Sequence, residues 1–235
     1  MSNSGDSMRE IRINPIVPTE SVLVATARGM RPKKAEEKAE RDTRAVVETC
    51  PFCRGNEDRT PPPIKSYPEG KDWEIRIVPN LYPVLGDDRA QSNIAFGLQQ
   101  VIDGYGRHEV VIDHPNHGIA LNEMSQQHLA DLFAVYQQRM TELYQSDPRL
   151  KYVLIFKNFG AAAGASIPHT HSQIIATPVV PENVQNEVHH SREYQRKFNH
   201  CVFCSLIDEA LTYEATIYDR ESGQIRRKVN VGQYV

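Results

Sequence analysis

The chain has 235 residues, of which 30 are acidic and 27 are basic, so its formal net charge is −3. This length fits one large domain or one and a half ordinary ones, and 40% hydrophobic with 24% charged residues is typical of a soluble globular protein. The sequence contains no apolar run long enough for a transmembrane helix and no secretory signal pattern. Its slightly negative net charge does not indicate the basic surface that nucleic-acid-binding proteins usually have. We therefore expect a cytoplasmic protein that binds small molecules or other subunits, and neither nucleic acid nor a membrane.

The predicted elements begin with a polar, irregular arm over residues 1–20, and residues 32–49 carry enough charge to predict a solvated loop or short surface helix. Alternating or β-branched apolar residues predict five strands, which end at turns or prolines. The expected strands are Ser21–Ala27, Trp73–Val78, Arg107–Asp113, Tyr152–Lys157 and His169–Thr177. Residues 182–200 are polar and predicted to be partly helical.

One helix is expected after Ser125, which is a favourable N-cap residue. Its apolar residues recur at spacings of three and four, which places them on one face and predicts a helix that packs against a core. This stripe comprises Leu129, Leu132, Phe133, Tyr136, Met140 and Leu143. Strands, a helix and further strands together predict an α+β fold with a mostly antiparallel sheet and helices packed on it.

The four cysteines form two pairs, Cys50-Pro-Phe-Cys53 and Cys201-Val-Phe-Cys204. Without an export signal the thiols should stay reduced, so each pair is interpreted as metal-binding or redox-active. A closed tetrahedral zinc site at Cys50 and Cys53 needs two more ligands. Spacing leaves these open: the candidates are His108, His114, His117, His169 and His171, or the second cysteine pair.

The segment from Asn158 to Gln173 carries the strongest chemical signal, because a Gly/Ala/Ser loop precedes His169-Thr-His171-Ser-Gln173. In a strand, His169, His171 and Gln173 would project to one face. A small-residue loop lets backbone N–H groups approach a phosphate, and a neutral imidazole is a competent nucleophile. This combination predicts attack of a histidine on a phosphate ester.

Five motifs in order resemble the galactose-1-phosphate uridylyltransferase family, a branch of the histidine-triad superfamily. They are Arg12-Ile-Asn-Pro15 with Val22–Pro32, Cys50–Cys53, Val78–Pro83, Val110–His117 and Asn158–Gln173. The resemblance covers roughly residues 10–200. It implies a histidine-triad-like fold and a homodimer as the expected assembly.

The resemblance also implies roles for individual residues. His171 would attack the α-phosphorus of a nucleotide sugar to form a nucleotidyl-histidine, and Gln173 would hold an oxygen of the transferred group. Arg28, Arg31, Asn158 and Ser166 would contact the phosphates, and Asn80 would lie near the base or ribose. Zn²⁺ would be structural, bound by Cys50, Cys53, His117 and His169.

Family members have two fused histidine-triad-like halves, so we expect a nucleotidyltransferase domain over residues 1–195 and an incomplete second half over 196–235. The first choice of reaction is exchange between UDP-glucose and galactose 1-phosphate, in galactose metabolism. In His169-Thr-His171-Ser-Gln173, uridylyltransferases usually have Pro and Gly in place of Thr170 and Ser172. A Ser at the second of these positions resembles the ADP-glucose phosphorylase-like branch. The alternatives are therefore an ADP-sugar phosphorylase or adenylyltransferase, and a zinc-stabilised nucleotide-binding fragment without turnover. A histidine-triad hydrolase is disfavoured because Gln173 replaces the third histidine.

Overall fold

The computed structural model describes residues 9–15, 18–26, 42–88, 93–160, 163–212, 216–218 and 225–228. The chain divides into two compact units, Met1–Pro181 and Glu182–Val235. Helix α2 (Glu182–Phe198) runs across the boundary expected after residue 195. The assignment of residues 196–235 to the start of a second histidine-triad-like half stays a prediction.

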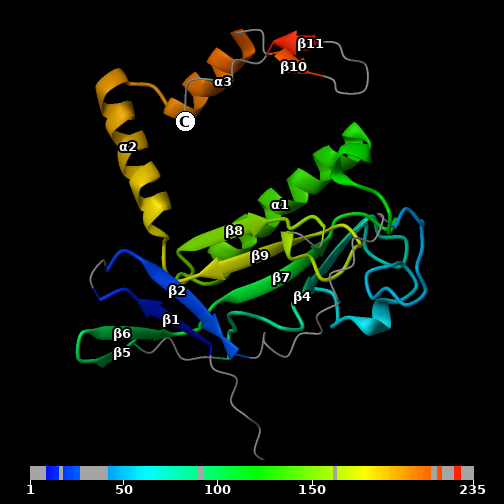
Figure 1. Ribbon diagram of the computed structural model, residues 1–235, viewed down its shortest axis with the longest axis horizontal. Coiled ribbons are helices and arrows are strands. Elements are labelled where there is room, and N and C mark those ends of the chain that lie inside the picture. Colours follow the sequence, from blue (N-terminus) through cyan, green and yellow to red (C-terminus); the bar gives the residue numbers. More distant parts are fainter. Residues whose placement is uncertain are drawn as a thin grey trace, which may run out of the picture. The chain divides into compact units, whose positions relative to one another are not determined.

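The first unit is built on a five-stranded antiparallel sheet in the order β3-β4-β7-β9-β8, drawn at the centre of Figure 1. Its strands are β3 (Lys65–Tyr67), β4 (Ile75–Pro79), β7 (Arg107–Ile112), β8 (Tyr152–Phe156) and β9 (His171–Thr177). Four of the five predicted strands lie in this sheet, and the predicted α+β class is confirmed. The predicted strand His169–Thr177 differs at its start: β9 begins at His171, so His169 lies before the strand.

Helix α1 (Gln126–Ser146) covers one face of this sheet, and the Ser125 hydroxyl caps it by accepting a hydrogen bond from the His128 N–H. The predicted stripe is confirmed except at Phe133, which is 59% exposed, while Val135 is buried in its place. Because 3.6 residues make one turn, Val135 shares the buried face with Leu132 and Leu143.

The two faces of the sheet carry different groups, because successive residues of a strand point to opposite sides. Val111 and Ile174 pack in the core beneath α1, together with residues of β4 and β8. Val110 and Ile112 face the other way and pack against Cys50, Phe52, Cys53 and Trp73. This second face is where His171 and Gln173 of β9 project.

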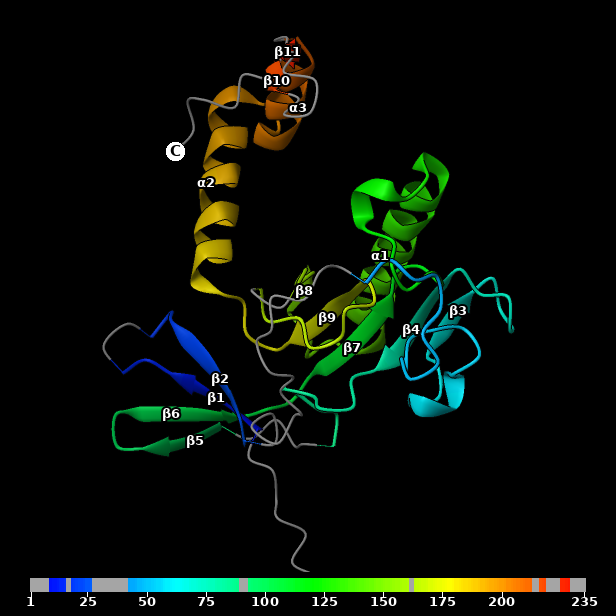
Figure 2. The same ribbon diagram turned by 45° about the vertical axis from the view of Figure 1, so that its right-hand side comes forward.

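A second antiparallel sheet has the order β2-β1-β6-β5, with β1 (Arg9–Ile13), β2 (Ser21–Ala25), β5 (Asn93–Phe96) and β6 (Gln99–Asp103); Figure 2 shows its strands together. The prediction of an irregular arm over residues 1–20 is wrong for β1, which pairs with strands on both sides and buries Ile11. Charged residues surround its two isoleucines, so the alternation was too short to be recognised.

Glycine is required where β6 leads into β7. Gly106 has a φ of 152°, and a Cβ there would lie 2.2 Å from the carbonyl oxygen of Ala176 in β9. This close approach lets β7 enter the sheet directly beside β9.

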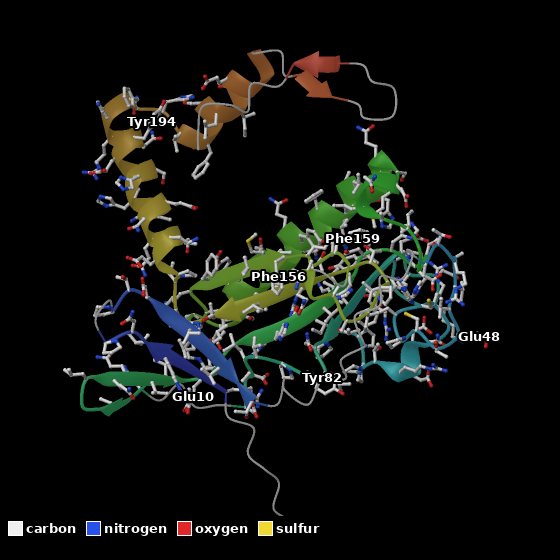
Figure 3. The ribbon with its side chains drawn as sticks, in the orientation of Figure 1. Glu10, Glu48, Tyr82, Phe156, Phe159 and Tyr194 are labelled. Atoms are coloured by element: carbon white, nitrogen blue, oxygen red, sulfur yellow. The ribbon has the colours of Figure 1, made fainter. Side chains whose placement is uncertain are left out.

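The second unit contains α2, α3 (Val202–Thr212), β10 (Thr216–Tyr218) and β11 (Ile225–Lys228). The hydroxyl of Tyr194, a residue of α2 that is labelled in Figure 3, donates a hydrogen bond to Ser205 Oγ and joins α2 to α3. Two short 3₁₀ helices in the first unit span Glu57–Arg59 and Leu121–Glu123. Within the described ranges, no helix combines the length and apolar character needed to cross a bilayer.

Candidate active site and metal centre

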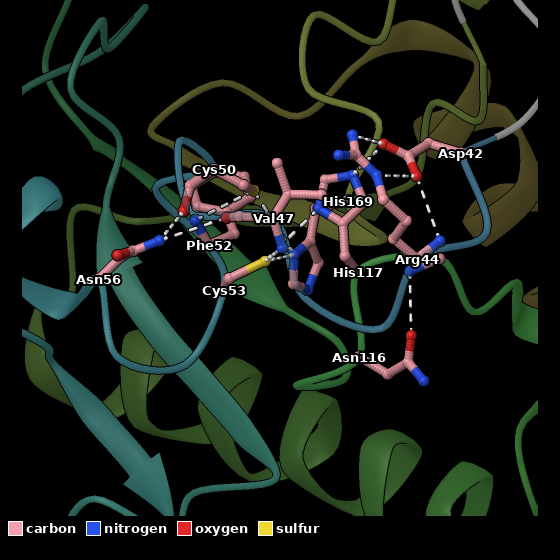
Figure 4. Close-up of polar contacts among 11 residues, drawn as sticks. Asp42, Arg44, Val47, Cys50, Phe52, Cys53, Asn56, Asn116, His117 and His169 are labelled. Atoms are coloured by element: carbon pink, nitrogen blue, oxygen red, sulfur yellow. Dashed lines mark hydrogen bonds and ion pairs between the residues drawn. The ribbon is translucent and has the colours of Figure 1, made fainter.

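Two cysteines and two histidines from three distant segments converge beside β9. Cys50 and Cys53 come from one turn, His117 follows β7, and His169 precedes β9 (Figure 4). The Nδ1 atom of His169 lies 3.6 Å from Sγ of each cysteine, and Nδ1 of His117 lies 3.5 Å from Sγ of Cys53. All four residues are buried.

This geometry fits a tetrahedral zinc site. With Zn–S bonds of about 2.3 Å and Zn–N bonds of about 2.0–2.1 Å, the edges of the tetrahedron between sulfur and nitrogen measure about 3.5–3.6 Å. The three separations above have this length. The four side chains therefore form a donor set that can hold a metal ion, and the set is complete without Cys201 or Cys204.

Groups around the donor set hold the ligands in place. Backbone N–H groups of Val47 and Phe52 point at the sulfurs of Cys53 and Cys50, at 3.3 and 3.4 Å. The remaining ring nitrogen of His169 donates to the His114 carbonyl at 2.7 Å. A hydrogen bond on the second ring nitrogen is typical of metal-binding histidines, because it fixes the ring and its tautomer.

Burial sets the protonation of these groups when no cation is near. It raises the pKa of the Cys50 thiol to about 11, with the neighbouring Cys53 adding to the shift. Burial also lowers the pKa of His169 to about 4, which keeps its imidazole neutral as a ligand requires. A divalent cation would favour the thiolate forms of the cysteines.

His171 is the first residue of β9, and one of its ring nitrogens contacts the backbone two residues earlier in the chain. Its Nδ1 lies 2.8 Å from the carbonyl oxygen of His169 and donates a hydrogen bond to it. In the neutral ring the proton is therefore on Nδ1, which leaves the lone pair on Nε2. The Phe52 ring packs edge-on against the imidazole, with 5.3 Å between centroids, and limits its rotation.

His171 lines a cavity of about 460 Å³, a volume in the range of small-molecule sites. Its walls come from the cysteine turn, the segment after β4, β7 and the loop before β9. Among the predicted site residues, the lining includes Cys50, Asn80, His117, Ser166, His171 and Gln173.

Three predicted phosphate contacts are not found in this lining, and two of them cannot be placed. Asn158 follows β8 and is not among the described residues that line the cavity. Arg28 and Arg31 lie outside the described residues. Two arginines that the sequence reasoning did not select, Arg44 and Arg59, do line the cavity. No local pattern marked them, since Arg44 lies in an irregular segment and Arg59 ends a single 3₁₀ turn.

A buried polar network, which no sequence motif marks, contacts β9 on the side away from the cavity. Lys157 Nζ donates to Asp113 Oδ2 at 2.6 Å and to the carbonyl of His171 at 3.2 Å. Asp113 also accepts hydrogen bonds from Ser172 and from Tyr136 of α1. The network explains why Ser172 faces α1, away from the cavity.

A second histidine cluster is held by hydrogen bonds within the protein. Glu74, His114 and His128 bring ligand-type atoms together, but Glu74 pairs with Arg54 at 3.0 Å. His114 Nδ1 accepts the Asn116 N–H at 2.9 Å, which leaves the proton on Nε2. Both features oppose binding of a cation there.

Comparison with known proteins agrees with this geometry. Residues 2–181 match the family described as galactose-1-phosphate uridyl transferase, N-terminal domain. An ADP-glucose phosphorylase from Arabidopsis thaliana is 32% identical over 219 residues, which is 88% of this chain and 62% of that protein. A galactose-1-phosphate uridylyltransferase from Thermotoga maritima is 29% identical, over 91% of this chain and 60% of that protein.

Solved structures give the same result. An Arabidopsis thaliana ADP-glucose phosphorylase with bound ADP-glucose is 30% identical with a TM-score of 0.60, covering 90% of this chain and 61% of that one. A uridylyltransferase structure is 27% identical with a TM-score of 0.64, covering 90% and 59%. The chain thus spans about 60% of the length of the relatives it matches.

Proposed function

The chain belongs to the galactose-1-phosphate uridyl transferase family, and on that premise we propose that it is a nucleotidyltransferase that acts on nucleotide sugars through His171. One observation carries the proposal. The bond from Nδ1 of His171 to the His169 carbonyl leaves the lone pair on Nε2 of a residue that lines the cavity. An imidazole in this tautomer needs no separate base before it attacks phosphorus.

The reaction consists of two balanced displacements. In the first, Nε2 of His171 forms a bond to the α-phosphorus, the bond from phosphorus to the bridging oxygen breaks, and hexose 1-phosphate leaves with the electron pair. In the second, a phosphate oxygen of the acceptor attacks phosphorus, and the N–P bond breaks to restore the lone pair. The imidazole ring is cationic between the two steps, and the His169 carbonyl stabilises it through Nδ1–H.

The cavity supplies groups for positioning and for charge neutralisation, which phosphoryl-type transfer needs most. In this proposal Gln173 holds an oxygen of the transferred group, Ser166 contacts a phosphate, and Asn80 lies near the base or ribose; all three residues line the cavity. Arg44 and Arg59 are the positively charged side chains among the described lining residues. Phosphate contacts from Arg28, Arg31 and Asn158 remain part of the proposal on family grounds.

Zn²⁺ is the proposed occupant of the set formed by Cys50, Cys53, His117 and His169. When bound there it would supply structural bracing rather than Lewis-acid chemistry. The backbone carbonyl of His169 accepts the hydrogen bond from His171 Nδ1. Fixing the His169 ring therefore also fixes the acceptor for the His171 ring. The proposed role of His169 is thus to hold the nucleophile in register.

We place exchange between UDP-glucose and galactose 1-phosphate first, in cytoplasmic galactose metabolism and with a homodimer as the working assembly. ADP-sugar phosphorolysis or adenylyl transfer is the second candidate, and the 32% identity to an ADP-glucose phosphorylase favours it. A zinc-stabilised nucleotide-binding fragment without turnover is the third, because the chain spans about 60% of its relatives.

Intact-mass measurement separates these candidates. The protein is incubated with UDP-glucose or with ADP-glucose and quenched without acid, since a phosphoramidate is acid-labile. A uridylyl adduct supports the first candidate and an adenylyl adduct the second, and either must be lost in His171→Gly. Binding of nucleotide with no adduct from either donor contradicts nucleotidyl transfer and leaves the third candidate.

A further inference from the structure

A buried histidine lies behind Gln173 and has no part in the chemistry described above. His108 is on β7, the strand paired with β9, and only 5% of its surface is exposed. It points to the cavity side of the sheet, as Val110 does two residues later, yet it is not among the described residues that line the cavity. A buried polar ring behind a substrate-facing amide calls for a reason.

The hydrogen bonds of His108 define its tautomer. The backbone N–H of Val84 donates to Nδ1 at 3.1 Å, so the ring proton is on Nε2. Nε2 lies 3.0 Å from Oε1 of Gln173 and donates to it. The order of donation therefore runs from the Val84 backbone through the imidazole to the amide oxygen of Gln173.

A second donor converges on the same oxygen. The amide of Asn80 is itself oriented, because its Oδ1 accepts the Tyr82 N–H at 2.9 Å. Its Nδ2 consequently faces Gln173 Oε1 at 3.5 Å. Because Nε2 of His108 is protonated, the 3.1 Å between it and Asn80 Nδ2 separates two donors that share this acceptor. One donor comes from the buried side of Gln173 and the other from the cavity wall.

This arrangement permits one orientation of the Gln173 amide. If the amide turned over, its NH₂ would meet the N–H of His108 and the NH₂ of Asn80, and three donors would share no acceptor. In the observed orientation Oε1 is directed at His108 and Asn80, and because Gln173 lines the cavity, its NH₂ is the end of the amide left to bind a ligand there. The end of the amide that faces a phosphate is therefore a donor, where the reverse orientation would present a repelling oxygen.

We propose that His108 is a positioning residue that fixes the Gln173 amide with its NH₂ toward the transferred phosphoryl group. This inference rests on the proposed function and extends it to a residue that does not touch the substrate. His108 acts through its Nε2–H alone. A substituted side chain that donates a hydrogen bond from the same position should preserve the function of His108. A side chain that only fills the same volume should not.

Two substitutions separate donation from volume. His108→Phe keeps a ring in the core and removes the donor, whereas His108→Gln places an amide NH₂ near the position of Nε2. We expect His108→Phe to reduce kcat for nucleotidyl transfer about tenfold, with a much smaller change in KM for the nucleotide sugar. His108→Gln should recover most of that loss. His128→Phe, a half-buried histidine on α1 outside the cavity lining, is the matched control and should leave kcat unchanged.

A double-mutant cycle tests whether His108 acts through Gln173. In a Gln173→Ala background, the further change His108→Phe should alter kcat less than about twofold, because its target is already gone. Equal losses in both backgrounds, or loss of metal and of Tm in His108→Phe, would show a structural role and overturn the inference.

NMR of nitrogen-labelled protein gives a test that does not depend on turnover. Long-range proton–nitrogen correlations should find His108 neutral with its proton on Nε2. An Nδ1–H tautomer, or a charged ring at neutral pH, contradicts the inference even in an active enzyme. Conversely, an Nε2–H tautomer in a protein that forms no nucleotidyl adduct contradicts the proposed function and not the geometry of His108.

Discussion

The backbone carbonyl of His169 accepts the Nδ1–H of His171 at 2.8 Å, while the His169 ring points into the cysteine cluster. One residue thus contributes its side chain to the candidate metal site and its main chain to the proposed nucleophile. We expect a displacement of His169 to move the acceptor of the His171 Nδ1–H, which would couple the two proposed sites.

Loss of a cysteine ligand should affect both metal content and stability. We expect about one zinc per chain, and Cys50→Ser should lower zinc content and Tm together, because metal-binding free energy contributes to folding. Elemental analysis and thermal unfolding measure the two effects. Cys201→Ser, at an exposed cysteine of the second unit, is the control and should change neither. Unchanged zinc in Cys50→Ser would remove the assignment.

The buried pair of Lys157 and Asp113 should be costly to break. Asp113 is completely buried, so Lys157→Met leaves a carboxylate without its cation and should reduce the free energy of unfolding by about 3–5 kcal/mol. Adding Asp113→Asn should recover part of this loss. Lys65→Met is the control: it removes a partly exposed pair with Glu142 and should cost about 0–1 kcal/mol. Denaturant unfolding gives all of these values, and equal losses at both lysines would contradict the prediction.

Ser172 should contribute to the stability of the fold and should not influence whether UDP-glucose or ADP-glucose is the preferred substrate. Its hydroxyl donates to Asp113 beneath α1, on the face opposite the cavity. Ser172→Gly, which introduces the residue usual in uridylyltransferases, should therefore cost about 1–3 kcal/mol in unfolding free energy. The ratio of rates with UDP-glucose and ADP-glucose should stay the same. A shift of that ratio would show that residue 172 helps to select between the uracil and adenine bases of the nucleotide sugar.

Asp147 should make stability depend on pH at the end of α1. Hydrogen bonds from Arg149 and from Tyr105 hold the pKa of Asp147 well below its usual range. A carboxyl with a depressed folded pKa contributes stability above the unfolded value of 3.8, and this contribution is lost as pH falls through the folded pKa.

Asp147→Asn should thus lower unfolding free energy by about 1 kcal/mol at neutral pH, a modest value because Arg149 is half exposed. The difference from the parent protein should shrink at pH values below about 4. Thermal unfolding at several pH values measures it, with Asp131→Asn on the exposed face of α1 as control. A difference that is constant with pH would exclude the linkage.

Elements with strong periodic patterns can be predicted from the sequence alone. The alternating strands around His108 and His171 and the capped helix after Ser125 appear as predicted, because burial of one face imposes that pattern on the residues. The α+β class followed from their order. Strand β1 did not, since two isoleucines among charged residues give too little alternation to distinguish a strand from a loop.

The packing of distant segments in the fold fixes which groups meet. Spacing left five histidines open as partners for Cys50 and Cys53, and the fold brings His117 and His169 to them from segments 64 and 119 residues away. It also brings Asp113 to the hydroxyl of Ser172 and His108 to the amide oxygen of Gln173. Contacts of this kind join residues far apart in sequence, so no local pattern of charge or hydrophobicity encodes them. They follow from strand register and from the burial of polar groups that must find partners.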